Sequence, residues 1–372
     1  MTPLIDLKAQ YQDIEDEVQA AIQRVLSSAR FIGGAEVKLF EEEFASFCGV
    51  GHAVACGNGT DALELVLDAW GIGPGDEVIV PAVSWISTSE VVVTRGAKAV
   101  FVDVDPSTNC LPLAETEAAI TDRTKAIILV HLYGYPAAAA EFRALADRHN
   151  LLLLEDCAQA HGAECSGRRV GAFGHAATFS FFPSKSLGAF GDAGCVVTAD
   201  EQLSSTVRAL ANHGMRGRRH VHTLHGRNSR MDSLQAAILR VKLRRLPHWL
   251  VAKRTLMEHY NRGLAELSAR RDGFSLPPLP SGGLHGAHLY APVVMDRAGL
   301  TAYLARHDVQ TAVHYPTPLP LHRCYDPPEG TAARFPHATK LCSGTLSLPL
   351  YAELPPERVA DICRTVVDFY EG

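Results

Sequence analysis

The feature that most constrains the fold is a series of short apolar segments, separated by stretches with helical spacing. These segments cover residues 53–56, 77–83, 99–104, 126–133, 151–155, 177–183 and 195–198. Near-continuous apolar runs of this length are typical of strands buried on both faces. Strands of this kind, joined by helices, form a mostly parallel sheet with helices on both sides, so the sequence predicts an α/β fold.

Three of these segments end in residues that could form a binding site. Trp85 follows the second segment, Asp156 follows the fifth, and the turn from Pro183 to Lys185 follows the sixth. In open parallel sheets, ligands bind in the crevice at the carboxyl ends of the strands. We therefore predict that these residues face one crevice.

The rest of the chain is mainly helical by its apolar spacing. Helices are predicted over 13–29, 36–47, 62–70, 231–267 with a break at Pro247, 300–307 and 356–370. Residues 270–286 are rich in Pro and Gly and are interpreted as a connection, and 289–295 as a strand. This order predicts a large α/β domain over 1–250 and a small C-terminal α+β domain over 251–372.

The composition is that of a soluble globular protein: 47% of the 372 residues are hydrophobic and 20% are charged. The net charge of −6 argues against nucleic-acid binding, and no signal peptide or membrane span is visible. The nine cysteines are scattered without regular spacing, which predicts reduced thiols and a cytoplasmic protein.

Lys185 lies in a segment, 178–194, that is otherwise apolar, small or hydroxylic. Removal from bulk water lowers the pKa of a lysine, and the neutral amine is a nucleophile towards carbonyl groups. Ser180 offers a hydroxyl nearby. The alternative is a surface lysine on a glycine-rich turn.

The turn 57–62 lies between a predicted strand and a predicted helix, and exposed N–H groups at a helix start bind anions. Asp61 and Glu64 have the spacing of a capping box, which predicts a helix start near residue 61. An ordinary helix cap remains open. The turn also fits the dinucleotide fingerprint G-x-G-x-x-G/A, but the acid expected at the end of the next strand is absent.

Asp156 ends a buried apolar strand, where a carboxylate either has a cationic partner or stays neutral. Trp85 is either a core residue or a stacking surface for a ring. His161 is as well explained by a buried, hydrogen-bonded histidine as by a functional role. The basic loop 213–227 contains His220, His222 and His225, but no carboxylate or cysteine joins them, so we predict no metal site there.

Several segments together resemble the DegT/DnrJ/EryC1/StrS family of pyridoxal-phosphate-dependent sugar-nucleotide aminotransferases. They are Gly59-Thr-Asp-Ala-Leu63, Pro81-Ala-Val-Ser-Trp85, Asp156-Cys-Ala-Gln159, Ser180-Phe-Phe-Pro-Ser-Lys185, Asn228-Ser-Arg-Met-Asp232 and His314-Tyr-Pro-Thr-Pro-Leu319. The resemblance covers nearly the whole chain. One departure is Ser186, where the family commonly has asparagine. The resemblance implies the aspartate-aminotransferase type of fold (fold type I).

The family pattern also implies a role for each matching residue. Lys185 would hold pyridoxal 5'-phosphate and move a proton, and Asp156 would pair with the pyridine nitrogen. The other cofactor-binding residues implied are Gly59, Thr60, the amide of Asp61, Trp85, Gln159 near the ring hydroxyl, Ser180 and Asn228. In the family, the residue matching Asn228 reaches the site of a neighbouring subunit, which implies a homodimer. His314, Tyr315 and Arg219 of the basic loop are the candidate substrate contacts.

The reaction implied is transfer of an amino group from an amino acid, glutamate by expectation, to a keto sugar linked to a nucleotide diphosphate. The versions of the segments around Lys185 and Asn228 look nearest to members that aminate C3. An aminocyclitol aminotransferase of the inosose type, a cofactor-bound regulator without turnover and a nicotinamide dehydrogenase remain alternatives. A sugar dehydratase of the same fold is disfavoured, because those members have histidine where Lys185 stands.

Overall fold

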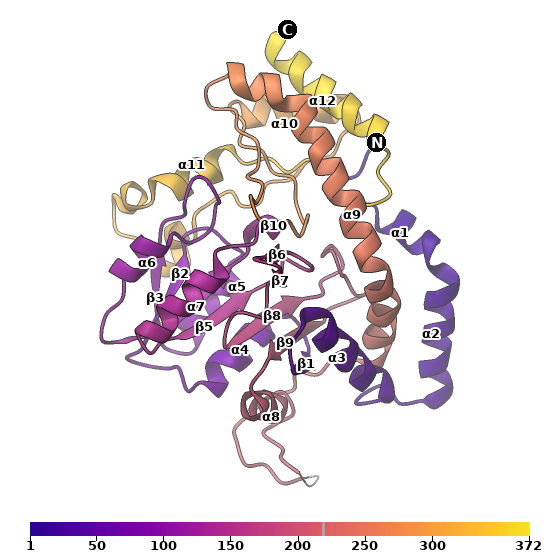
Figure 1. Ribbon diagram of the computed structural model, residues 1–372, viewed down its shortest axis with the longest axis vertical. Helices are drawn as coiled ribbons and strands as arrows, with labels where there is room; N and C mark the ends of the chain where they lie inside the picture. Colours follow the sequence, from indigo (N-terminus) through magenta and orange to yellow (C-terminus); the bar gives the residue numbers. More distant parts are fainter. Residues whose placement is uncertain (218–219) are drawn as a thin grey trace.

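The computed structural model describes residues 1–217 and 220–372, and at its centre lies a seven-stranded sheet with helices on both sides (Figure 1). The strand order is β1-β9-β8-β5-β4-β2-β3. The strands are β1 (His52–Cys56), β2 (Glu77–Pro81), β3 (Lys98–Val102), β4 (Thr124–Val130), β5 (Leu152–Asp156), β8 (Ala176–Ser180) and β9 (Gly194–Thr198). β9 pairs antiparallel with β1 and β8, and the other four pairings are parallel. The predicted mostly parallel α/β sheet is confirmed.

Both faces of the sheet are buried, which explains the lack of alternation in its sequence. Successive residues of a strand point to opposite faces. In β1, Val54 and Cys56 join one hydrophobic core, while Ala53 and Ala55 join a second core on the other face. The first core is covered by α4 (Gly59–Ala69), α5 (Ser87–Thr94), α7 (Ala139–Arg148) and α8 (Glu201–Leu210), and α6 (Leu113–Ala118) lies beside α7.

The second core is covered by two helices that lie far apart in the sequence, α3 (Ala35–Cys48) and α9 (Ser233–Arg270). α1 (Leu7–Asp13) and α2 (Glu15–Ser28) precede α3. The helix predicted over 13–29 corresponds to α2, which begins two residues later than predicted, and α1 was not predicted. α2 packs on the outer side of α9 through Val18, Ala21 and Val25 (Figure 1).

The predicted break at Pro247 is wrong: α9 is one helix of 38 residues that contains this proline. Proline removes one backbone hydrogen bond and costs about 3 kcal/mol or more inside a helix. The neighbours Leu246, Trp249 and Leu250 are all buried, and α9 packs against α2, α3 and α12 (Pro356–Glu371). This burial on several sides outweighs the loss of a single hydrogen bond.

The chain after α9 surrounds a third hydrophobic core, which runs from Leu256 to Tyr370. α10 (Arg297–Arg306) and α12 pack on this core, whereas α11 (Pro336–Gly344) packs on the first core through Ala338, Leu341 and Cys342. β10 (Gly283–Leu284) pairs with a hairpin of β6 (Glu164–Cys165) and β7 (Arg168–Arg169). The remaining elements are short 3-10 turns at 132–134, 319–321, 323–325 and 331–334.

The predicted strand over 289–295 is wrong, because this segment makes only isolated bridges. Tyr290 bridges Leu348, and Val293 bridges Ser275 and Thr345. Proline at 292 has no N–H to donate, which prevents a regular ladder. Among the described residues, the helices are too short or too polar to span a lipid bilayer.

Candidate functional site

A cavity of about 420 Å³ opens beside the carboxyl ends of the central strands. Nine of the residues singled out from the sequence line it: Gly59, Thr60, Trp85, Asp156, Gln159, Ser180, Lys185, His314 and Tyr315. The predicted crevice shared by Trp85, Asp156 and Lys185 is therefore confirmed. Strand order explains the convergence, because β5 lies next to β8 and parallel to it.

Lys185 is held at the cavity by a tightly curled loop after β8. The amide of Lys185 donates to Phe182 O at 2.8 Å, and the amide of Ala189 donates to Phe181 O at 2.7 Å. A Cβ added to Gly188 would lie 2.2 Å from Pro183 O, so only glycine fits at this point of the curl. Burial lowers the pKa of the Lys185 ammonium to about 8, although the nearby carboxylate of Asp156 raises it in part.

Asp156 is 6% exposed and points into the same cavity. Its carboxylate accepts hydrogen bonds from Thr88 Oγ1 at 2.9 Å and from the amide of Ala158 at 3.1 Å. Burial raises the pKa of this carboxyl above its usual value, while the two hydrogen bonds and Lys185 counteract that shift. No arginine, lysine or histidine of the described chain lies within ion-pair distance of it, so a cationic ligand group would complete its environment.

The amino end of α4 forms another wall of the cavity, with Asn58, Gly59 and Thr60 exposed to it. The helix begins at Gly59, two residues before the predicted start, because Asn58 is the cap and its Oδ1 accepts the amide of Asp61 at 2.8 Å. A Cβ at Gly59 would lie 2.6 Å from the Cβ of Ser180, so the glycine lets α4 approach β8. This helix end can bind an anion.

Asp61 does not line the cavity. Its amide donates to Asn58, and its carboxylate accepts a hydrogen bond from Ser229 Oγ at 2.6 Å. A phosphate contact through the Asp61 amide would have to replace the bond to Asn58, and it stays a prediction.

Aromatic and amide side chains form the side of the cavity near Trp85. Trp85 is 57% exposed, and its ring lies 5.8 Å from that of Tyr315, tilted by 48°. Gln159 Nε2 donates to the Tyr315 hydroxyl at 2.8 Å, and its Oε1 accepts the amide of Tyr133 at 2.8 Å. The core interpretation of Trp85 does not hold, because its indole is available to stack on a bound ring.

His314 reaches the cavity from the chain after α9. Its Nδ1 lies 2.8 Å from Ser347 Oγ, and burial, followed by the charge of Lys185, lowers its pKa to about 4. The imidazole is therefore neutral at neutral pH and can accept or donate a hydrogen bond to a ligand.

His288, which no sequence motif indicated, also lines the cavity and is 6% exposed. Its Nδ1 has no hydrogen-bond partner among the described residues, and burial lowers its pKa. His288 sits in an apolar segment with no local signal for a site. Its amide bonds to Tyr133 O at 3.2 Å, so a long-range contact places it.

Thr88 was missed for a different reason. It lies in the first turn of α5, and its only visible signal was the hydroxyl-rich run after Trp85, from Ser87 to Ser89.

Besides Asp61, two more predicted site residues are not placed in this cavity by the described structure. Asn228 is exposed, and its Oδ1 accepts a hydrogen bond from Arg230 Nε at 3.0 Å. Arg219 lies outside the described residues. His161 is fully buried between Phe179 and Phe181, and both of its ring nitrogens lack a partner in the described chain.

Another buried cluster, His131, Glu155 and Cys157, has metal-like spacing but is bound internally. The Nδ1 of His131 accepts the amide of Ala137, so its Nε2 carries the proton and donates to Glu155 at 3.0 Å. The same carboxylate accepts three amides of the loop 171–174. These bonds use both imidazole nitrogens, which explains the cluster as a structural network.

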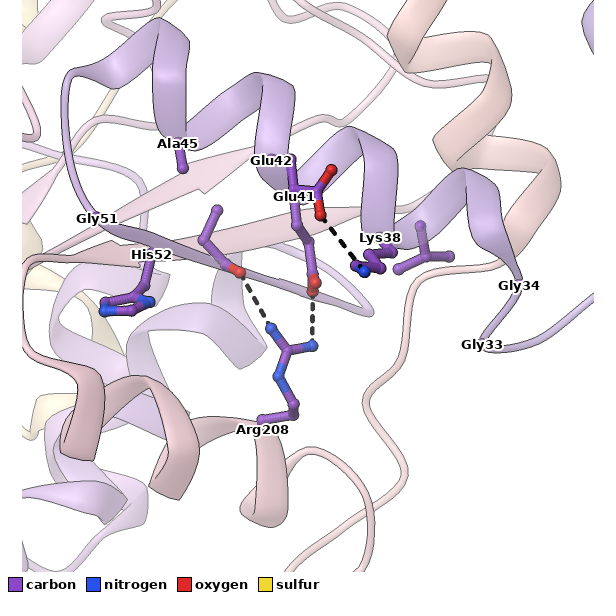
Figure 2. Close-up of a pocket in the computed structure, with 11 residues that line it drawn as sticks. Gly33, Gly34, Lys38, Glu41, Glu42, Ala45, Gly51, His52 and Arg208 are labelled. Carbon is purple, nitrogen blue, oxygen red and sulfur yellow. Dashed lines mark hydrogen bonds and ion pairs between the residues drawn. The ribbon is translucent and has the colours of Figure 1, made fainter.

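A second cavity of about 460 Å³ lies between α3, the start of β1 and Arg208 (Figure 2). Arg208 binds Glu41 at 2.9 Å and Ala53 O at 3.2 Å (Figure 2). Glu41 also accepts the amide of Ala55 at 2.8 Å. None of the site residues inferred from the sequence lines this cavity, and its charged groups are paired with one another. The first cavity is therefore the candidate active site.

Comparison with known proteins gives similarity over the whole chain. The family model of the DegT/DnrJ/EryC1/StrS aminotransferases matches residues 12–367. A dTDP-3-amino-3,4,6-trideoxy-alpha-D-glucose transaminase of Streptomyces venezuelae is 43% identical, covering 97% of this chain and 95% of that protein. A pleiotropic regulatory protein of Geobacillus stearothermophilus is 40% identical, covering 99% of this chain and 98% of that protein.

Among solved structures, S. venezuelae DesV in complex with a ketimine intermediate has a TM-score of 0.95 and 41% identity. The match covers 100% of this chain and 99% of that one. The fold is therefore the aspartate-aminotransferase type, as the resemblance implied, and the cofactor is pyridoxal 5'-phosphate. The chain belongs to the DegT/DnrJ/EryC1/StrS aminotransferase family.

Proposed function

We propose that this aminotransferase moves an amino group from an amino acid, glutamate by expectation, to C3 of a keto sugar linked to a nucleotide diphosphate. The observation that carries the proposal is the placement of Lys185 and Asp156 in one cavity at the strand ends. The named transaminase of S. venezuelae, similar over nearly its entire length, supports a 3-amino sugar nucleotide as the product.

The residues of the cavity fit pyridoxal phosphate group by group. The buried carboxylate of Asp156 lacks a cationic partner among the described side chains, and a protonated pyridine nitrogen would supply one. The amino end of α4, with Gly59 and Thr60, offers donors to a phosphate. Trp85 offers a stacking surface, Gln159 binds the Tyr315 hydroxyl in the same cavity, and Ser180 borders the helix end. When bound, the cofactor serves as an electron sink for the carbanion formed at the substrate carbon.

Lys185 would first hold the cofactor and then act on protons. Its lowered pKa makes the neutral amine accessible near neutral pH, as a nucleophile or general base requires. Once free, the amine would take a proton from the carbon of the amino-acid donor and pass it to the cofactor. With the keto sugar it would move a proton in the reverse direction. Asp156, kept ionised by its hydrogen bonds and a cationic partner, would hold the ring nitrogen protonated during that step.

His314 and Tyr315 are the proposed sugar contacts, and both line the cavity. Arg219 of the basic loop is proposed to bind the substrate diphosphate, because arginine binds phosphate through two parallel hydrogen bonds.

We also propose a homodimer in which Asn228 serves the neighbouring cavity. Asn228 is exposed and does not line the cavity of its own chain. The side chains of Phe31, Ile32, Phe182 and Phe190 are 44–52% exposed, an amount of apolar surface that a partner subunit would cover. Mixing Lys185→Ala and Asn228→Ala subunits should then restore activity, since one pocket of each heterodimer carries neither defect. If subunit exchange is verified with two affinity tags and activity stays absent, sharing of the site is excluded.

A domain boundary near residue 250, inside α9, is proposed for the same chain. Residues after this point form the third hydrophobic core, while the first half of α9 packs on the second core.

The experiment that tests the function uses the aminated enzyme and a panel of nucleotide-linked keto sugars. Return of the visible absorbance of the cofactor identifies the substrate, and the product is then analysed for the carbon that carries nitrogen. Failure with every keto sugar but success with an inosose would favour the aminocyclitol alternative. The regulatory protein among the relatives keeps a regulator without turnover open, and a single turnover with glutamate distinguishes it.

A further inference from the structure

The loop that carries Lys185 is also held from behind, by a buried lysine of α9. Lys242 is 1% exposed, and its ammonium donates to Gly188 O at 2.5 Å. This carbonyl belongs to the residue at which the loop curls back on Pro183. The same ammonium lies 5.4 Å from the centre of the Phe190 ring, so it contacts the loop at two points.

Two more residues of the same helix contact the loop. Lys253 Nζ lies 3.3 Å from Ser186 Oγ, and Gln235 Oε1 accepts the amide of Phe190 at 2.8 Å. Positions 235, 242 and 253 are separated by 7 and 11 residues, close to whole numbers of turns at 3.6 residues per turn. They therefore form a single stripe along α9 that faces the loop from residue 186 to residue 190.

Neither Lys242 nor Lys253 forms an ion pair with a carboxylate of the described chain. Glu353 is the acid that influences both, but no described carboxylate lies within ion-pair distance of either ammonium. Both oxygens of Glu353 lack hydrogen-bond partners in the described chain. A buried ammonium paired only with neutral groups costs stability, because it loses its hydration and no ion pair compensates for that loss. A cost of this kind is typical of groups retained for function.

We propose that Lys242 is a positioning residue that fixes the orientation of the Lys185 amine by binding Gly188 O, and that Lys253 supports the start of the same loop. The inference rests on the proposed role of Lys185. Lys185 is separated from Gly188 by two residues, so rotation of the unpinned Gly188 peptide would swing the Lys185 backbone. The amine would then be displaced from its place in the cavity that it shares with Asp156.

The test compares Lys242→Met, which keeps the length of the side chain, with the wild-type holoenzyme. Four quantities are measured: amide hydrogen exchange over residues 182–190, the pH dependence of the visible absorbance of the bound cofactor, the melting temperature and turnover. We expect exchange in the loop to rise at least about tenfold and the absorbance titration to shift. The melting temperature should stay unchanged or rise. Turnover should fall at least about tenfold, and Lys253→Met should cause a smaller change of the same kind.

Arg244→Met is the matched control, because Arg244 is an exposed cation of the same helix that pairs with Glu17. It should alter none of these quantities. A lower melting temperature with unchanged loop exchange and an unchanged titration would show that Lys242 is merely structural and would overturn the proposal. Failure of the proposed function has a different signature: borohydride would trap the cofactor on a residue other than Lys185 in the wild-type protein.

Discussion

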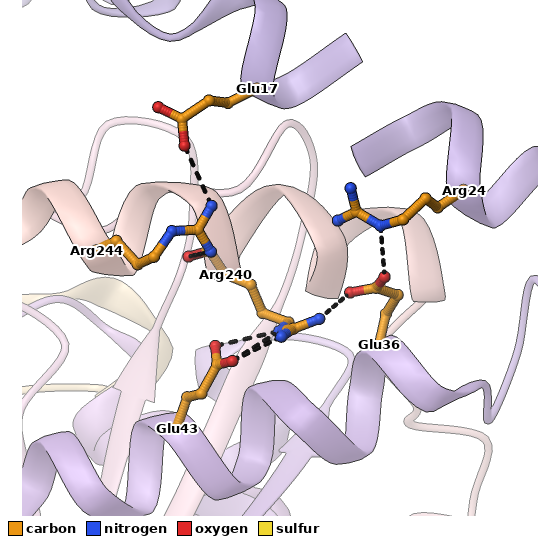
Figure 3. A network of polar contacts seen from close by, with 6 residues as sticks. All are labelled: Glu17, Arg24, Glu36, Glu43, Arg240 and Arg244. Carbon is orange, nitrogen blue, oxygen red and sulfur yellow. Dashed lines mark hydrogen bonds and ion pairs between the residues drawn. The ribbon is translucent and has the colours of Figure 1, made fainter. Parts of the chain in front are cut away.

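Two cations of α9, only two residues apart in sequence, lie in contrasting environments. Arg240 faces α3 and binds two of its carboxylates, Glu43 at 2.7 Å and Glu36 at 2.5 Å (Figure 3). Lys242 faces the Lys185 loop and binds one neutral carbonyl. A step of two residues turns a helix by about 200°, which places these side chains on opposite faces.

The polar network around Arg240 continues outward, with Arg24 bound to Glu36 and Arg244 bound to Glu17 (Figure 3). Every charge of that network has a partner of opposite sign, and water can screen what remains. Asp156 at the cavity and Lys242 behind the Lys185 loop are buried, Lys185 is half-buried, and none of the three has an ion pair with a described residue. The difference indicates that the paired charges join helices, whereas the unpaired ones are available for ligands and for positioning.

The largest expected effect is that of Lys185→Ala. Without the amine, the cofactor binds only non-covalently and no group moves the proton, so turnover should disappear. The fold should remain, since the alanine removes a buried charge and no described hydrogen bond of its side chain. Steady-state rates and borohydride trapping followed by peptide mass analysis check both points. Full transaminase activity in this variant would refute the proposed site.

Asp156→Asn should have the next largest effect. The amide cannot hold the pyridine nitrogen protonated, so the proton-transfer rate should fall strongly, measured in single turnovers with glutamate. A change within about threefold, or roughly 0.7 kcal/mol of barrier, would mean that Asp156 does not pair with this nitrogen.

The burial of Lys242 should make the stability of the protein depend on pH. The pKa of Lys242 is about 8 in the folded protein, against 10.5 for a free lysine. Below pH 8 the ammonium is charged in both states and its burial cost is complete; between pH 8 and 10.5 the cost declines, and above 10.5 it is gone. Chemical denaturation should therefore show the stability difference between Lys242→Met and wild type becoming less favourable to the variant as pH rises through this range. A difference that stays constant with pH would contradict this assignment.

Arg240→Met should have the smallest effect on function and a modest effect on stability. Partly exposed ion pairs contribute about 0–1 kcal/mol each, and Arg240 is joined to two carboxylates. We expect a loss of about 1–2 kcal/mol in the free energy of unfolding, reduced by high salt, with unchanged turnover. Loss of turnover equal to that of Lys242→Met would break the comparison between the two faces of α9.

Local patterns in the sequence sufficed for several features. The near-continuous apolar runs predicted the sheet, since burial on both faces excludes polar residues whatever the neighbouring strands are. Strand ends followed from the same runs, and with them the meeting of Trp85, Asp156 and Lys185. Motif resemblance indicated the family and the cofactor, because the residues that contact a shared cofactor recur at matching positions.

Other features depend on contacts between distant segments, and only the tertiary structure decided them. α9 continues through Pro247 because helices from both ends of the chain pack around it. The close fit of Gly59 against Ser180 depends on the packing of α4 on β8. His288 enters the cavity through a backbone bond to Tyr133, and Lys242 reaches Gly188 across 54 residues of sequence. The energy of each of these contacts arises from partners that no local window of the sequence contains.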